Sequence, residues 1–183
     1  MVNLNENKFK GNIKWEYYVN SLLVNFSFGD SSYICSIIQS DLFDNLRNDI
    51  YSANSKRMKN ALLFFANCFK IWNFGINHLL DDYRIIENIL RRMEKNYSQM
   101  KGRDIEIILE IFTNYIELGF YEVDINEGKL VPKSDSKNQN LLDFVWLGGM
   151  HFLEYYMNIC NDEFIYEKIV EFMDKYIEDK IDE

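Results

Sequence analysis

Proline and glycine, the residues that most often interrupt regular secondary structure, are scarce in this sequence. Its 183 residues include one proline, Pro132, and eight glycines. A chain with so few breaking residues is poorly suited to the many tight turns that join short strands. The scarcity therefore favours helices over a sandwich or barrel.

Cysteine is also rare, and its placement fits neither a disulfide framework nor a zinc site. Cys35, Cys68 and Cys160 are odd in number, lie far apart and form no C-x-x-C pair. Their mostly apolar neighbours are typical of free thiols that pack as small hydrophobic side chains. We therefore expect a reducing, cytoplasmic location.

Long hydrophobic runs are missing. The first twelve residues, MVNLNENKFKGN, lack the apolar segment of a secretory signal. The most apolar stretch, residues 61–80, is interrupted by polar side chains that a bilayer disfavours, among them Lys70, Asn73 and Asn77. The sequence predicts neither secretion nor contact with a membrane.

Basic side chains are outnumbered 20 to 29 by acidic ones, which gives a net charge of −9. Binding to nucleic acid draws much of its affinity from Lys and Arg that neutralise phosphates, so the composition argues against direct nucleic-acid binding. The imbalance is concentrated near one end. Residues 162–183 contain nine acidic residues and three lysines.

Motifs of common catalytic sites are absent. The sequence has no G-x-S-x-G, no Walker loop, no G-x-G-x-x-G following a strand, no H-E-x-x-H and no EF-hand loop. We therefore predict no catalytic residues, no cofactor and no bound metal.

Apolar residues, in contrast, make up 48% of the chain and recur at helical spacings almost throughout. With no internal repeat and no second hydrophobic unit, residues 1–183 are expected to form a single domain. The prediction is a mainly all-α compact bundle of about six to seven helices. They are expected near residues 15–26, 34–50, 58–80, 83–100, 103–118, 141–160 and 163–181.

Three of these helices carry further expectations. The 58–80 helix is apolar on most of its circumference, so we place it at the centre of the core. Asp81 or Asp82 is expected to cap the helix that follows. In the 141–160 helix, Gly148 and Gly149 allow a kink or the close approach of another backbone.

One segment has the period of a strand instead. Tyr121, Val123 and Ile125 alternate with polar residues, a turn follows at residues 126–129, and Pro132 ends the next apolar pair. This pattern predicts a short β-hairpin near residues 120–132. The polar residues 133–140 are predicted to form a loop and are the best candidate for disorder.

Two alternative functions arise from these elements. His78 and Asp81, like His151 and Glu154, are three residues apart and so share a helix face, which allows a metal-dependent or acid/base enzyme. The 103–118 helix followed by a hairpin allows a winged-helix-like transcription regulator. That helix has a single basic residue, Arg103, so its charge argues against the second alternative.

The last predicted helix has the most distinctive surface. Its acidic residues recur at spacings of three and four and share one face: Glu163, Glu167, Glu171, Asp174, Glu178 and Asp182. We refer to these six residues as the acidic ridge. Its alternatives are a solvated face that only aids solubility and a protein-binding site, and we predict the second.

The leading prediction is therefore a non-enzymatic, acidic protein-binding protein whose partner is a basic protein. Abundant Asn and Ile with scarce Ala are typical of AT-rich coding sequences, which indicates a bacterial or phage source. Small acidic helical proteins of such sources often inhibit proteins that act on nucleic acids, as toxin-immunity and phage anti-defence proteins do. By that analogy we expect an inhibitor.

Overall fold

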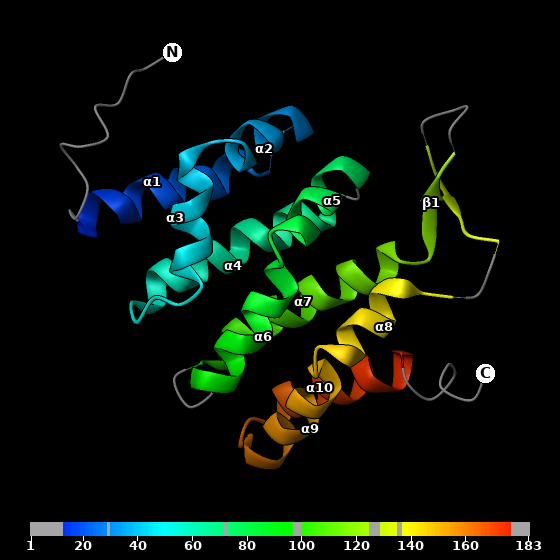
Figure 1. The fold of residues 1–183 in the computed structure, drawn as a ribbon. Coiled ribbons are helices and arrows are strands. Elements are labelled where there is room, and N and C mark those ends of the chain that lie inside the picture. The colour runs from blue at the N-terminus through cyan, green and yellow to red at the C-terminus, as the bar shows by residue number, and fades with distance from the viewer. Residues whose placement is uncertain are drawn as a thin grey trace.

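A computed structural model describes residues 13–28, 30–71, 73–96, 100–124, 129–134 and 137–176 (Figure 1). Within those ranges the chain forms ten α-helices and one antiparallel pair of strands. The predicted mainly helical fold is therefore confirmed, although the helices outnumber the six or seven expected. In order they are α1 (Ile13–Phe26), α2 (Ser31–Ile38), α3 (Asp41–Asp49), α4 (Ser55–Lys70), α5 (Phe74–Asp82), α6 (Ile85–Asn96), α7 (Gly102–Leu118), β1 (Tyr121–Val123), β2 (Leu130–Pro132), α8 (Gln139–Trp146), α9 (Gly149–Ile159) and α10 (Glu163–Tyr176).

The core is organised around α4 and α7, which pack against each other. Eight of the sixteen residues of α4 and ten of the seventeen residues of α7 are buried. In Figure 1, α1 to α3 lie on one side of this pair and α8 to α10 on the other. The first part of the 58–80 segment thus supplies the centre of the core, as predicted.

Three predicted helices are each divided in two. The 34–50 stretch breaks between α2 and α3, the 58–80 stretch between α4 and α5, and the 141–160 stretch between α8 and α9. Asn73 starts α5 because its side-chain oxygen accepts a hydrogen bond from the backbone N–H of Ile76 at 3.2 Å. The apolar period continues across each break because both halves face the same core.

The prediction that Asp81 or Asp82 caps the next helix is wrong. Both residues belong to the end of α5, and α6 starts at Ile85. Between the helices, Arg84 has a φ of 52°, in the left-handed region, and its N–H donates to the carbonyl of Asp81 at 2.8 Å. This turn closes α5, as left-handed residues commonly close helices.

Within the predicted polar loop, Asn138 is the N-cap of α8, which begins at Gln139. Its side-chain oxygen accepts from the N–H of Leu141 at 3.0 Å, while its amide donates to the carbonyl of Ile116 at 2.8 Å. A Cβ on Gly119 would lie 1.9 Å from that side-chain oxygen, so this close approach requires glycine. The last turn of α7 is therefore held by the start of α8. Residues 135 and 136 lie outside the described residues.

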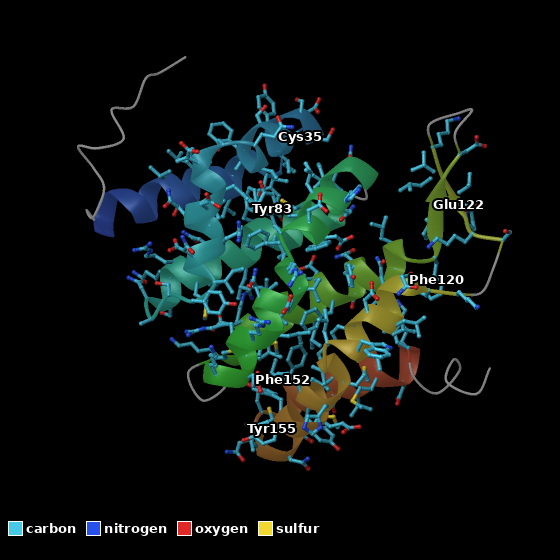
Figure 2. The ribbon with its side chains drawn as sticks, viewed as in Figure 1. Cys35, Tyr83, Phe120, Glu122, Phe152 and Tyr155 are labelled. Atoms are coloured by element: carbon cyan, nitrogen blue, oxygen red, sulfur yellow. The ribbon has the colours of Figure 1, made fainter. Side chains whose placement is uncertain are left out.

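The predicted hairpin is present. Tyr121 pairs with Pro132 and Val123 with Leu130 in an antiparallel register. Figures 1 and 2 show the two strands standing away from the helices, with Glu122 on β1 and Phe120 at its base. The predicted turn falls largely on residues 125–128, which lie outside the described residues.

All three cysteines are free, as predicted. Cys68 is buried in α4, and desolvation raises the pKa of its thiol, which keeps the thiol protonated and unreactive. Cys35 and Cys160 are half-buried. Among the helices that the structure describes, none is long and apolar enough to cross a membrane.

Candidate functional site

The described part of the acidic ridge faces solvent. Glu163, Glu167, Glu171 and Asp174 are exposed on α10, and Glu178 and Asp182 lie outside the described residues. The opposite face of α10 is buried where the helix packs against α7 and α9: Ile165, Ile169, Phe172 and Tyr176. The ridge is therefore displayed on a helix that its other face anchors.

Lysines neutralise this ridge only in part. Lys168 lies 2.6 Å from Glu171, and hydrogen bonding to that carboxylate raises the pKa of Lys168. Lys175 lies 2.6 Å from Glu117 of α7, whose carboxylate also accepts a hydrogen bond from Tyr176 at 2.7 Å. One of the two lysines thus ties α10 to α7.

The two histidines lie on different helices, and neither forms a salt bridge with the carboxylate three residues after it among the described residues. In α5, Nδ1 of His78 lies 3.7 Å from Asp82, not Asp81, and both side chains are well exposed. His151 is exposed on α9 and makes no ion pair with Glu154 in the described part of the chain. Among the described residues, no three His, Cys, Asp or Glu side chains come together as a metal site.

The helix that the winged-helix alternative would place in a DNA groove is α7. It packs against α4, α8 and α10 and is buried over most of its length. Its exposed positions include Glu110 as well as Arg103. A recognition helix needs an open face that meets phosphates and base edges, so the burial and charge of α7 do not favour this function.

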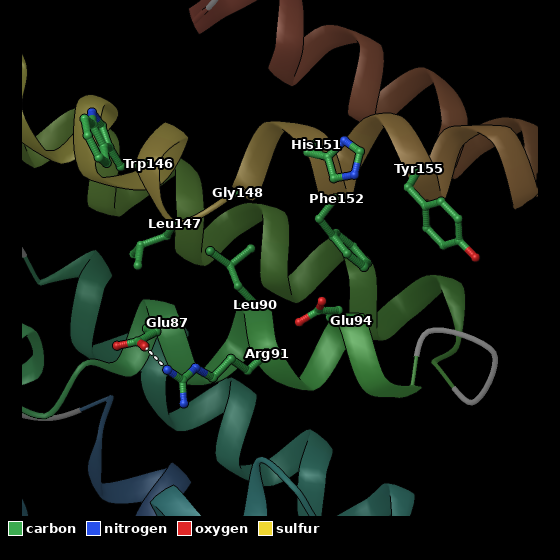
Figure 3. Close-up of a pocket in the computed structure, with 10 residues that line it drawn as sticks. All are labelled: Glu87, Leu90, Arg91, Glu94, Trp146, Leu147, Gly148, His151, Phe152 and Tyr155. Carbon is green, nitrogen blue, oxygen red and sulfur yellow. Dashed lines mark hydrogen bonds and ion pairs between the residues drawn. The ribbon is translucent and has the colours of Figure 1, made fainter.

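A groove that the sequence analysis did not identify lies between α6 and the α8–α9 segment (Figure 3). It is about 560 Å³ in volume, and Leu90, Leu147 and Phe152 point into the gap between the two segments. The other lining residues are Glu87, Arg91 and Glu94 from α6 and Trp146, Gly148, His151 and Tyr155 from the opposite side. Charged and aromatic side chains thus border an apolar floor.

Trp146 stands at one end of this groove and is 88% exposed. Leu142 and Val145, also exposed, share its face of α8, whereas Leu141 and Phe144 are buried. Gly148, with a φ of 84°, ends the segment directly after Leu147. The run LLDFVWL holds more apolar residues than one buried face of a helix accommodates. This excess is the feature of the sequence that could have indicated an exposed apolar surface on α8.

A second hollow continues from Trp146 toward the junction of α5 and α6. It is lined by Asp81, Arg84, Ile85, Ile86, Glu87, Tyr115, Asp143, Trp146 and Leu147. Because Glu87, Trp146 and Leu147 also line the groove, the two hollows meet at the end of α8. We refer to Leu142, Val145 and the residues that line these two hollows as the Trp146 surface.

Within the Trp146 surface, the carboxyl group of Asp81 has a raised pKa. Partial desolvation of this otherwise exposed residue, followed by repulsion from Asp143, raises the pKa of Asp81 from 3.8 to about 6. The folded state therefore binds the proton of the Asp81 carboxyl group more tightly than the unfolded chain does. The contribution of this protonation to the free energy of unfolding is complete below pH 4 and is lost as the pH rises through about 6. At neutral pH the charged carboxylate is therefore destabilising.

Replacing Asp81 with asparagine is accordingly expected to stabilise the protein at pH 7. We expect a gain of about 1 kcal/mol, which allows for the solvent that still reaches the carboxylate. The gain should shrink as the pH is lowered from 7 to 4, where wild-type Asp81 is protonated in the folded state. Urea unfolding at the two pH values measures this, with Asp82→Asn as the matched control. An equal gain at both pH values would contradict the assignment.

Comparison with known protein families and with curated proteins finds no match to this sequence. Functional inference therefore depends on the surfaces of this chain itself.

Proposed function

We propose that this protein acts by binding a basic partner protein and not by catalysis. The observation that carries the proposal is the row of four carboxylates on the solvent side of α10, opposite the buried face of the same helix. A helix fixed to the core presents charges in a defined arrangement, which favours recognition of a complementary surface.

Fixed charges of this kind act mainly on the rate and selectivity of association. Opposite charge on a partner steers the encounter and can raise the association rate by a factor of about 10 to 1,000 at low salt. Beyond a Debye length of about 8 to 10 Å, physiological salt screens the attraction. The proposed interaction is therefore fast and sensitive to salt.

The partner class that fits this charge is a protein that acts on nucleic acids. Such proteins carry clefts lined with Lys and Arg that neutralise phosphates, and an acidic helix competes with nucleic acid for such a cleft. By analogy with small acidic inhibitors, the proposed role is inhibition, of the toxin-immunity or phage anti-defence type. The net charge of −9 fits this role.

Reversing the described ridge to lysine at Glu163, Glu167, Glu171 and Asp174 is expected to slow association about tenfold or more at low salt. The partner is the protein that wild-type chain captures from its native source, and stopped-flow or surface-based kinetics give the rates. Dissociation should change less, because steering acts before contact.

The matched control reverses four exposed carboxylates outside the ridge, on α5, α7, β1 and α9: Asp82, Glu110, Glu122 and Glu154. It changes the net charge by the same amount, so it separates the ridge from overall charge. Circular dichroism verifies that both variants remain helical. If both variants slow association equally, or neither does, the ridge is only a solvated face.

A further inference from the structure

We propose that the Trp146 surface binds an amphipathic, lysine- or arginine-bearing segment of a partner protein. This site is separate from the acidic ridge, and the inference does not require the ridge to bind anything. Tryptophan is enriched among the residues that dominate binding energy at protein interfaces, and clustered exposed apolar residues mark interaction sites. Trp146, Leu142 and Val145 form such a cluster beside the groove.

The charges around these apolar residues define the chemistry of the partner. Both arginines of the surface are directed to one carboxylate, since Arg91 lies 2.5 Å and Arg84 3.7 Å from Glu87. The remaining carboxylates are Asp81, Glu94 and Asp143. Asp143 accepts a hydrogen bond from the neutral side chain of Gln139 at 2.7 Å, and no lysine or arginine of the described ranges forms a salt bridge with any of the three. An incoming basic side chain therefore finds carboxylates available for ion pairing.

A second copy of this chain fits poorly as the occupant. In a symmetric dimer the same surface meets itself, so the carboxylates of one copy would face those of the other. The two arginines that would relieve this repulsion are already directed to Glu87 within each copy. Like charges placed across an interface are costly, which favours a basic partner.

The shape of the surface argues for a peptide segment over a small molecule. Small-molecule sites enclose most of their ligand, whereas Trp146 at the end of this groove is 88% exposed and Tyr155 and Glu94 are exposed on its sides. Figure 3 shows the groove running between α6 and the α8–α9 segment. An amphipathic helix bound in such a groove places apolar residues inside and basic residues at the acidic margins.

Two synthetic helical peptides with the same leucine pattern test this inference, one with lysine and one with glutamate at every polar position. The readout is the indole N–H signal of Trp146 in ¹⁵N NMR spectra, identified by its loss in Trp146→Phe. We expect the lysine peptide to shift this signal in a saturable titration at 150 mM salt. The glutamate peptide should leave it unchanged.

Variants then locate the bound peptide by the change in its dissociation constant. Trp146→Ala is expected to weaken lysine-peptide binding at least tenfold, and Glu94→Lys severalfold. The control Phe28→Ala removes a ring that is 71% exposed in the turn after α1, and Glu167→Lys alters only the ridge. Both controls should bind as the wild type does.

Three results would overturn the inference. Equal binding of the two peptides would show that charge plays no role. Weakening by Glu167→Lys without weakening by Trp146→Ala would place the peptide on the ridge, which would leave the proposed function standing. A dimer in sedimentation equilibrium that Trp146→Ala dissociates would identify a second copy as the occupant.

Discussion

Replacing Arg57 with methionine is expected to lower the free energy of unfolding by about 3 kcal/mol. Arg57 lies at the start of α4, and its Nε donates to Oδ1 of Asp49 at 2.9 Å. The side chain of Asp49, at the end of α3, is only 2% exposed. Without the guanidinium this buried carboxylate loses the countercharge that Arg57 supplies, at a position that solvent hardly reaches.

Urea unfolding measures this loss, and an unchanged slope of free energy against urea would show that the unfolding transition is otherwise the same. Lys70→Met is the control, because the pair between Lys70 and Glu110 is exposed on both sides and should contribute about 1 kcal/mol or less. The double variant Asp49→Leu/Arg57→Met should recover part of the stability, since neither charge then remains buried. A loss for Arg57→Met no larger than that for Lys70→Met would disprove the assignment.

The features that the sequence predicted correctly depend on local geometry. The acidic ridge follows from the spacing of residues along a single helix. In the structure its four described carboxylates are exposed, opposite the buried Ile165 and Ile169. The hairpin follows from alternation and from Pro132. Whether the ridge binds a partner stays a prediction, because exposure alone does not distinguish a binding site from a solvated face.

The features that the sequence did not predict are helix ends, which depend on where the chain turns and on what packs across each turn. Hydrophobic periodicity does not reveal that Asn73 starts a new helix, or that Arg84 adopts a left-handed conformation, because the core-facing pattern continues through both positions. Periodicity therefore identified helical segments well and helix ends poorly.

The Trp146 surface was missed for a related reason. A sequence shows that LLDFVWL is too apolar for one buried face, but not which residues the packing leaves outside. That choice depends on the left-handed turn at Gly148 and on α6, which meets α9 from a distant part of the chain. Only the folded chain brings Glu87, Glu94 and Trp146 to one groove.

The turn itself leads to the last prediction, which concerns Gly149→Ala. A Cβ at this position would lie 2.3 Å from the ring of Phe144, far closer than van der Waals contact allows. That ring is fully buried and packs 4.8 Å from the ring centre of Phe112 and 5.8 Å from that of Phe172. Since the ring has little room to move, we expect a loss of about 2 to 3 kcal/mol in the free energy of unfolding.

Two comparisons separate this overlap from backbone strain. Gly148→Ala meets no atom within 4 Å but must keep a φ of 84°, so it should cost only about 1 to 2 kcal/mol. Phe144→Leu removes Cζ and Cε2, the two ring atoms that overlap most with the added Cβ. The double variant Gly149→Ala/Phe144→Leu should therefore lose clearly less stability than the two single losses added together. Strictly additive losses would mean that Phe144 does not restrict position 149. The close approach of Gly149 to the Phe144 ring would then not be what fixes the start of α9 beside the Trp146 surface.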